Sequence, residues 1–287
     1  MARFVINRIL WAIPVFWLVA TVTFVLMKAT PGTPWDAFNA ASGGRLDPSL
    51  RASWERQYGL DRPLIVQYFS YLGNALRFNF GESYAQQGTP VTELIERGFP
   101  YSARIGVYAL IMAVLIGIPL GVVAALRQNT IVDYLSLFFA TVGATIPSFV
   151  LGFFLLAFFG VTLNLVPVLW TDWRNYVLPV AVLGIGTCAF IARLTRASVL
   201  EIVRQDYVRT ARAKGLPSRT VNMRHVLRNG LIPVVTILGP ALAGLITGTI
   251  IIENVFGVPG MGYLYIQSVV QRDYPTIMGT TLFYTLF

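Results

Sequence analysis

The stretch that decides the fold is 105–126, which reads IGVYALIMAVLIGIPLGVVAAL and holds no charged residue in 22 positions. A helix rises by about 1.5 Å per residue, so this run can cross a hydrocarbon layer about 30 Å thick. The whole sequence agrees: 55% of its 287 residues are hydrophobic, only 12% are charged, and the mean hydropathy is +0.64. Soluble domains carry about 25% charged residues. The sequence therefore predicts a membrane protein.

Four more uncharged runs have the length of a span, at 9–27, 134–159, 176–192 and 231–252. The first is longer than the core of a signal peptide, so we interpret it as an uncleaved span. A sixth apolar segment begins at Tyr274 and is still apolar at Phe287, which is too short to cross and predicts a last helix that is cut short. The expected fold class is an all-α polytopic membrane protein with six transmembrane helices, the last one incomplete.

Positive charge is concentrated in two places. Arg3 and Arg8 precede the first span, and 193–228 holds nine basic residues against two acidic ones. Because cytoplasmic loops carry such an excess of Lys and Arg, we expect both parts in the cytoplasm and the long connection outside. The predicted domains are a first transmembrane helix (1–28), an external helical subdomain (29–104) and a transmembrane core (105–287). The core includes a cytoplasmic loop (193–230) and an external loop (253–273).

The sequence lacks the residues of several kinds of active site. Cys188 is the only cysteine and His225 the only histidine, so neither an internal disulfide nor a Cys/His metal site can form. The predicted spans hold no Asp, Glu, Lys, Arg or His, which argues against a proton- or sodium-coupled carrier. Neither Lys28 nor Lys214 stands in a phosphate-cradling loop. Energy for active transport would have to come from a separate subunit.

The basic segment predicts a helical hairpin in the cytoplasm. Its composition suits a helix over 197–214, which Gly215 and Pro217 would end, and Ser218 is placed to cap a second helix that ends near 229–230. Such a helix can dock into a groove of a partner. A solvated helix at the membrane surface is the alternative, and anionic lipid headgroups are an alternative partner. With only 36 residues and a span at each end, the basic segment is not expected to bind nucleic acid.

The external connection predicts two helices. Asp47 and Pro48 resemble the N-cap and the first residue of a helix, and Gly59 is placed to end that helix. A second helix is expected over 63–78, with one apolar face made by Ile65, Phe69, Leu72 and Leu76. This subdomain would serve as a lid or a platform for a delivering protein, or would simply pack over the ends of the spans.

Small residues within the spans permit close helix contacts. Gly117 with Gly121, and Gly244 with Gly248, recur at four-residue spacing, which suits packing within the chain. Alternatively, the fifth span lies against the pathway or a partner chain, with pore or packing candidates at Gly239, Ala243, Gly244 and Gly248. The loop 253–273 is rich in Gly and Pro and is not expected to remain a regular helix. We interpret it as part of an external gate that includes Glu253, Phe256, Pro259, Gly260, Met261, Gly262 and Asp273.

Several motifs resemble one known family. The segments 207–216 (YVRTARAKGL) and 224–233 (RHVLRNGLIP) resemble the cytoplasmic coupling loop of ABC-transporter permeases, and most of all the dipeptide, oligopeptide and nickel importer group. Further motifs of this family are PGTP, GLDRP, ENVFGVPGMG and RDYP, at 31–34, 59–63, 253–262 and 272–275. The resemblance covers nearly the whole chain.

The resemblance implies a type I ABC importer permease in a bacterial or archaeal plasma membrane, which would form half of a pore with a second, homologous permease chain. Two ATP-binding subunits would hold ATP and Mg, and an extracellular or periplasmic substrate-binding protein would deliver the cargo. This chain would be non-catalytic and without a cofactor. The ATPase-coupling residues would be Asp206, Tyr207, Val208, Arg209, Thr210, Ala211, Arg212, Ala213, Lys214 and Gly215.

One departure from the wider permease pattern is informative. Arg209, Thr210 and Ala211 stand where many permeases have Glu-Ala-Ala, a substitution that resembles the peptide subgroup. Peptide is therefore favoured over nickel chelate, glutathione or sugar oligomer as cargo, by resemblance only. An ion-coupled secondary carrier and a non-transporting membrane scaffold are the alternative interpretations of the whole chain.

Overall fold

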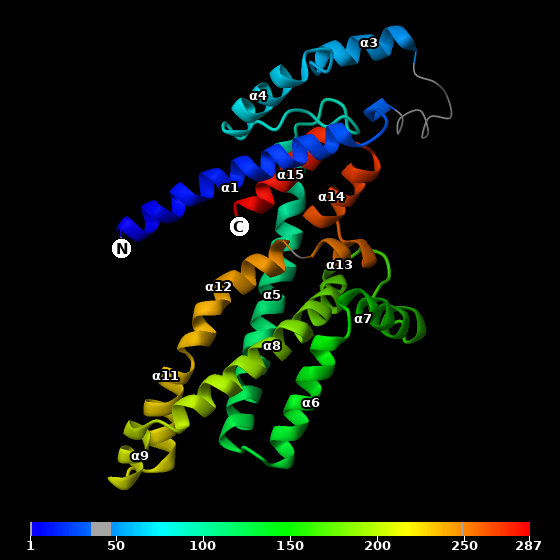
Figure 1. Cartoon of the computed structure of the whole chain (residues 1–287). Coiled ribbons are helices and arrows are strands. Elements are labelled where there is room, and N and C mark those ends of the chain that lie inside the picture. Colours follow the sequence, from blue (N-terminus) through cyan, green and yellow to red (C-terminus); the bar gives the residue numbers. More distant parts are fainter. Residues whose placement is uncertain (1, 36–46, 248) are drawn as a thin grey trace. The chain divides into compact units, whose positions relative to one another are not determined.

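The computed structural model describes residues 2–35, 47–247 and 249–287, which are mostly helical and contain no β-strand (Figure 1). Their contacts divide the chain into two compact units. The first unit is Met1–Pro100 with Pro259–Phe287, and the second is Tyr101–Val258. The domain bounds expected from the sequence remain a prediction.

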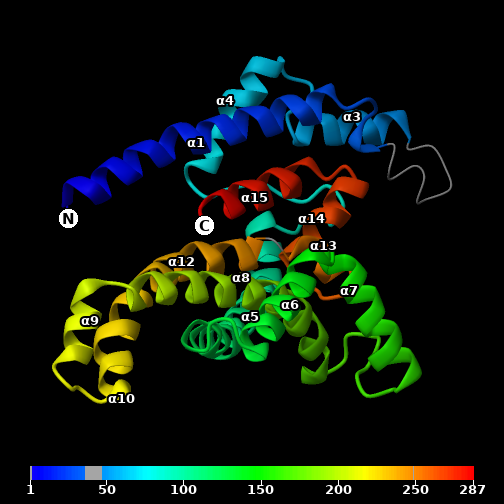
Figure 2. The ribbon, with the colours of Figure 1, turned by 60° about the horizontal axis from the view of Figure 1, so that its bottom comes forward.

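The first unit joins the two ends of the chain. It contains α1 (Ala2–Ala29), α3 (Pro48–Gln57), α4 (Leu64–Ala75), the first turns of α5 (Val91–Leu126), α14 (Met261–Val270) and α15 (Tyr274–Thr285). α1 and α15 lie side by side, as both views show (Figure 1, Figure 2). The apolar core between these helices is made by Ala20, Ala75, Phe80, Val91, Ile95, Met261 and Leu282.

The local signals of the external connection are confirmed. Asp47 is the N-cap of α3, where its side chain accepts from the backbone N–H of Ser49 at 2.8 Å, and Pro48 is the first helical residue. Gly59 has a φ of +65° just after this helix, a conformation that glycine adopts without strain. Of the predicted apolar face of α4, only Leu72 packs against the apolar core of the first unit, beside Ala75 and Tyr71. Ile65, Phe69 and Leu76 are more than 60% exposed.

The second unit is built around α8 (Val177–Val203), which packs against α6 (Ile131–Thr145), α7 (Ser148–Leu155) and α12 (Ile232–Thr247). A 3₁₀ turn, η2 (Trp173–Tyr176), leads into α8, and α13 (Ile250–Val255) follows α12. α5 also packs on α8 through small residues: a Cβ atom added to Gly117 would lie 2.9 Å from the carbonyl oxygen of Cys188. The predicted close contact at Gly117 and Gly121 is therefore confirmed.

Among the described residues, four helices are long and apolar enough to cross a membrane, and the number rises to five if a bent pair of helices counts as one span. Four are continuous in apolar character, at Ile6–Ala29, Val91–Leu126, Trp173–Val203 and Ile232–Val255. The fifth is a bent pair of helices, Ile131–Thr145 and Ser148–Thr162. α15 has 12 residues, so a sixth span and the cytoplasmic side of the N-terminus remain predictions.

The third predicted span, 134–159, is broken in the structure. α6 ends at Thr145, Ile146 is extended, and the next helix turns away by 95° before it passes into the π-helical turn η1 (Leu156–Thr162). The physical reason is Pro147, which lacks an N–H and drives the residue before it out of the helical conformation. The second span also begins earlier than the charge pattern indicated, since α5 starts at Val91 and continues through Arg104.

Candidate functional site

The cytoplasmic hairpin predicted from the sequence exists, but its first arm is broken. α8 ends at Val203, Gln205 is extended, and a separate helix, α9, covers Asp206–Ala213. The second arm runs through α10 (Ser218–Thr220), the π turn η3 (Val221–Leu227) and α11 (Arg228–Gly230). The break corrects the single helix expected over 197–214. It lets α9 turn back and bury one apolar side on the second arm.

The turn between the two arms forms as predicted at Gly215 but not at Ser218. Gly215 has a φ of +76°, and the N–H of Gly215 and that of Leu216 donate to the carbonyls of Arg212 and Ala211 at 2.9 and 3.3 Å. These bonds satisfy carbonyl groups at the helix end, as a C-terminal glycine motif requires. Pro217, not Ser218, holds the cap position of the second arm, and it supplies no side-chain bond.

The hairpin has its own apolar core. Val208 and Ala211 of α9 are buried at 0% and 6% exposure, and they pack with residues of α5, α8 and the second arm: Ala125, Val199, Val221 and Val226. This placement corrects one expectation from the sequence. Ala211 does not lie on the exposed side of α9, so its small side chain serves packing inside the chain rather than close approach by a partner.

A polar contact also joins the two arms. The side-chain amide of Asn229 donates to the Tyr207 hydroxyl at 2.9 Å, and that hydroxyl donates to the carbonyl of His225 at 3.4 Å. The Tyr207 ring is 42% exposed, so it offers part of its surface to a partner while its hydroxyl is held.

The exposed side of α9 is basic. Its exposed residues are Asp206, Tyr207, Arg209, Thr210, Arg212, Ala213, Lys214 and Gly215. Arg209 lies 3.6 Å from Asp206, one turn earlier, and both side chains are largely in solvent. The structure thus brings together the predicted coupling residues other than Val208 and Ala211 on one accessible surface, which we call the α9 surface.

The predicted gate residues divide between the two units. In the second unit, Glu253 is fully buried and its carboxylate accepts from the Thr249 hydroxyl at 2.5 Å. Phe256 is 5% exposed and lies in an apolar core with Ile105, Leu178, Val182, Ile252 and Val258. Gly257 takes a φ of +60°, so the helix breaks directly after this pair.

In the first unit, the gate segment is more helical than expected. α14 begins at Met261, directly after Gly260, so most of the predicted loop is a regular helix. Asp273 is 2% exposed and accepts from Ser83 Oγ at 2.5 Å, from the N–H of Tyr84 at 2.9 Å and from Thr276 Oγ1 at 2.7 Å. Those bonds give Asp273 a defined structural task, which is to hold the 83–84 turn against the start of α15.

Gly239 and Gly244 of α12 do not pack closely against other described residues. A Cβ atom added to Gly239 or Gly244 would meet nothing within 4 Å, and both residues are exposed. Ala243 is half-buried on the same helix. Gly248, the fourth candidate, lies outside the described residues. The expected packing of Gly244 within the chain is therefore not found, and this face of α12 is open.

An ion pair inside the second unit was not predicted from the sequence. Arg196 of α8 donates from Nε to Asp133 Oδ1 at 2.6 Å and from Nη2 to Oδ2 at 2.8 Å. The Asp133 side chain is 1% exposed and that of Arg196 21%. The two residues are 63 positions apart, so no local motif connects them. The only signal was one acidic residue at the very start of a predicted span.

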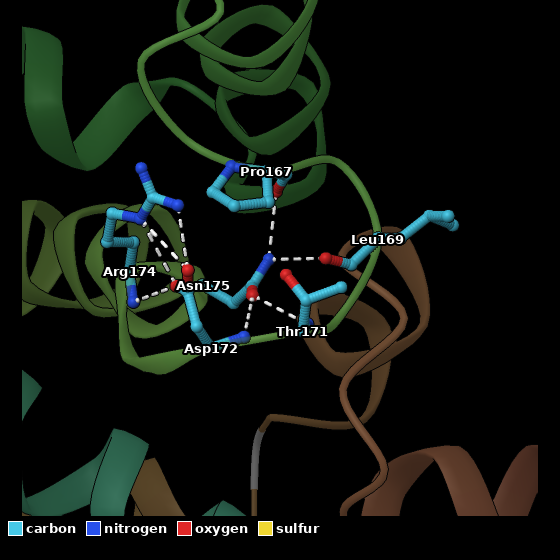
Figure 3. Close-up of polar contacts among 6 residues, drawn as sticks. All are labelled: Pro167, Leu169, Thr171, Asp172, Arg174 and Asn175. Carbon is cyan, nitrogen blue, oxygen red and sulfur yellow. Dashed lines mark hydrogen bonds and ion pairs between the residues drawn. The ribbon is translucent and has the colours of Figure 1, made fainter.

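The loop before α8 is fixed by one buried amide (Figure 3). Asn175, 4% exposed, accepts from the N–H groups of Thr171 and Asp172 and donates to the carbonyls of Pro167 and Leu169, all between 2.8 and 2.9 Å. Asp172 caps the 3₁₀ turn and pairs with Arg174 at 2.8 Å. Hydrogen bonds from that guanidinium hold the pKa of the Asp172 carboxyl below its ordinary value.

Comparisons with known proteins assign the fold and the family. The family described as "Binding-protein-dependent transport system inner membrane component" matches residues 117–287, and its N-terminal counterpart matches 1–112. The dipeptide transport system permease DppB of Bacillus subtilis (strain 168) is 46% identical over 288 residues, covering 100% of this chain and 92% of that protein. The oligopeptide transport system permease OppB of Salmonella typhimurium is 39% identical, with 98% and 92% covered.

Solved structures agree in fold. An amino acid ABC transporter aligns with a TM-score of 0.55 at 18% identity, over 68% of this chain and 87% of that one. The MetNI methionine ABC transporter aligns with a TM-score of 0.52 at 18% identity, over 68% and 93%. This chain belongs to the binding-protein-dependent transport system inner-membrane components. It is a multi-pass inner-membrane permease subunit of a binding-protein-dependent importer with the type I ABC importer permease fold.

Proposed function

We propose that this subunit forms half of the translocation pore of an ATP-driven importer that takes up short peptides or similar small solutes. The cargo is inferred from the relatives, since proteins similar over the full chain at 46% and 39% identity carry the names of dipeptide and oligopeptide permeases. An external binding protein would select the cargo, which fits the absence of an obvious ligand cluster in the predicted spans.

The energy would enter at the α9 surface. The observation that carries this proposal is the division of α9 into a buried side, with Val208 and Ala211 fully packed, and a basic side that is exposed. Because one side of α9 is packed against the rest of the hairpin, a force that a partner applies to its exposed side would move α9 and the hairpin together. Because Tyr207, Arg209 and Lys214 face outward, a groove with acidic groups on an ATP-binding subunit is a fitting partner. ATP and Mg would be bound by two such partner subunits and not by this chain.

The open face of α12 would meet the second permease chain or line the pathway. A side chain at Gly239 or Gly244 would enter open space. The helix is apolar and long enough to lie in the bilayer. Small residues let a neighbouring helix approach closely, which favours a permease–permease interface here.

On the outer side, we assign the segment 253–273 to the external gate. Glu253 and Phe256 are buried in the second unit, so opening would require this pair to leave its packed position. The external helices α3 and α4 would act as a lid or a landing platform for the binding protein.

The experiment is reconstitution of the purified complex in proteoliposomes with its binding protein and a panel of labelled dipeptides and tripeptides. We expect ATPase subunits and a second permease to co-purify, and peptide-loaded binding protein to raise both ATP hydrolysis and uptake. The double change Arg209→Gln with Lys214→Gln should weaken both, because it removes charge from the α9 surface. Arg219→Gln on the second arm is the matched control and should change little.

Two results would replace this proposal. Peptide uptake driven by an ion gradient without ATP would indicate a secondary carrier. A complex that assembles with a soluble partner but moves no solute would indicate a scaffold.

A further inference from the structure

The buried ion pair lies where three parts of the second unit meet. Asp133 is in the first turn of α6, and the N–H of Asn129, in the connection from α5, also donates to its carboxylate at 3.0 Å. Arg196 lies on α8, two turns before that helix ends. The carboxylate therefore receives bonds from both the α5–α6 connection and α8.

The next turn of α8 carries the hairpin. Val199, three residues after Arg196, is fully buried in the hairpin core with Val208 and Val226. The second arm also rests directly on this turn, since a Cβ atom on Gly230 would lie 3.1 Å from Val199 Cγ2. If the hairpin moves, it should therefore also move the turn of α8 that carries Arg196.

The ion pair differs in kind from the other contacts of α8. At Gly121 the backbone of α5 packs closely against α8, a contact that depends on shape and carries no charge. A guanidinium that donates two parallel bonds to one carboxylate has a fixed geometry. The pair thus adds a directional constraint between α8 and α6 to the packing of the two helices.

We propose that Asp133 and Arg196 are positioning residues that transmit movement of the hairpin along α8 to α6. α6 ends at the 95° bend before α7, so a rotation of α6 would also change the direction of α7. This inference rests on the proposed function, because it requires that the hairpin receive the push from an ATPase. The pair lies outside the α9 surface.

The test must separate this role from simple stabilisation. Removing one partner leaves a buried charge and destabilises the protein whatever its role, whereas replacing both with apolar residues of similar size is commonly neutral for stability. The informative variant is therefore Asp133→Leu combined with Arg196→Met, reconstituted with its ATPase subunits, sister permease and binding protein. The measured quantity is the number of labelled peptides imported per ATP hydrolysed.

We expect the double variant to assemble and to hydrolyse ATP within about twofold of the wild-type rate. Imported peptide per ATP should fall by at least about fivefold, the lower end of coupling between separate sites. Arg193→Met is the matched control, because Arg193 lies one turn earlier on α8 and reaches α6 only through one bond of 3.4 Å to the carbonyl of Ala140. It should keep the wild-type ratio.

An assembled double variant with an unchanged ratio overturns the inference. If the double variant does not assemble, Arg196→Lys decides, because lysine keeps the charge but cannot form the two-bond geometry. A reduced ratio in Arg196→Lys supports the inference, and a wild-type ratio rejects it. If the wild-type complex shows no ATP hydrolysis that responds to the binding protein, the proposed function itself fails, which is a different result from a failure of the pair.

Discussion

Gly121 of α5 lies so close to the carbonyl group of Ala192 in α8 that a Cβ atom at position 121 would stand 2.5 Å from that oxygen. The same atom would lie 2.6 Å from Cβ of Thr195. Neither neighbour is the free end of a long side chain, so the clash can be relieved only if the helices move apart. This contact fixes the distance between α5 and α8 just above the hairpin core.

Gly121→Ala should therefore destabilise the protein by about 1–3 kcal/mol, the usual cost of overpacking. Gly186→Ala is the matched control within α8, since the nearest atom to its added Cβ would be 3.9 Å away. There, alanine should be neutral or stabilising by about 1 kcal/mol through helix propensity. Thermal unfolding in detergent measures both. Equal unfolding temperatures for the two variants would contradict the close contact.

The hydroxyl of Thr195 gives a second prediction for the same helix interface. Thr195 is fully buried, and its Oγ1 has no hydrogen-bond partner among the described residues. Thr195→Val keeps the shape and removes an unpaired polar group, so the free energy of unfolding should stay equal or rise by about 1 kcal/mol. Thr187→Val is the control: its hydroxyl donates to the carbonyl of Leu183 at 2.9 Å, so no such gain is expected. A clear loss of stability in Thr195→Val would indicate that the Thr195 hydroxyl does have a hydrogen-bond partner.

Features encoded by adjacent residues were predictable. The cap at Asp47 and Pro48, the turns at Gly59 and Gly215, and the length of the apolar runs all follow from one or a few neighbours. These local conformations depend on neighbouring residues rather than on tertiary contacts, so they can be predicted without knowledge of the fold.

Features that depend on distant contacts were not predictable. The composition of 197–214 predicted a helix but could not tell that Val208 and Ala211 face the second arm, because that choice depends on Val221 and Val226. The pair Asp133–Arg196 joins two helices through the fold and leaves no periodic pattern. The uncharged run 134–159 predicted a span, but the size of the bend at Pro147 depends on how α7 packs against α8 and α13.

The loop in Figure 3 should depend on Asn175 far more than on its charged neighbours. Asn175→Ala removes four hydrogen bonds and leaves two N–H groups and two carbonyls without their partner, so amide exchange at Thr171 and Asp172 should accelerate at least about tenfold. Arg174→Gln should change this exchange little, since the Arg174 side chain is 51% exposed. Exchange at these two amides that stays unchanged in Asn175→Ala would contradict the assigned network.

The side of the membrane on which the hairpin lies can be measured directly. In a Cys188→Ser background, a cysteine at Arg51 should react with an impermeant maleimide in sealed cells, and a cysteine at Arg212 should react only after permeabilisation. Both positions are exposed, so accessibility within the fold is matched. The expectation follows from the excess of basic residues in 193–228. Labelling of position 212 from outside would reverse the topology and remove the hairpin from contact with any cytoplasmic ATPase.

The last prediction concerns the backbone at Gly215. Its φ of +76° is unfavourable for residues with a β-carbon, although a Cβ atom there would meet nothing within 4 Å. Gly215→Val should cost about 1–2 kcal/mol at this turn and let α9 shift on its core. Gly215→Asn is the matched control, because asparagine tolerates a positive φ better than valine while also adding bulk. We expect both variants to insert into the membrane, the valine variant to lose most ATP hydrolysis that responds to the binding protein, and the asparagine variant to keep most of it. Equal losses in both would mean that a partner approaches Gly215 too closely for any side chain, and no loss in the valine variant would mean that the position of α9 is not critical for coupling.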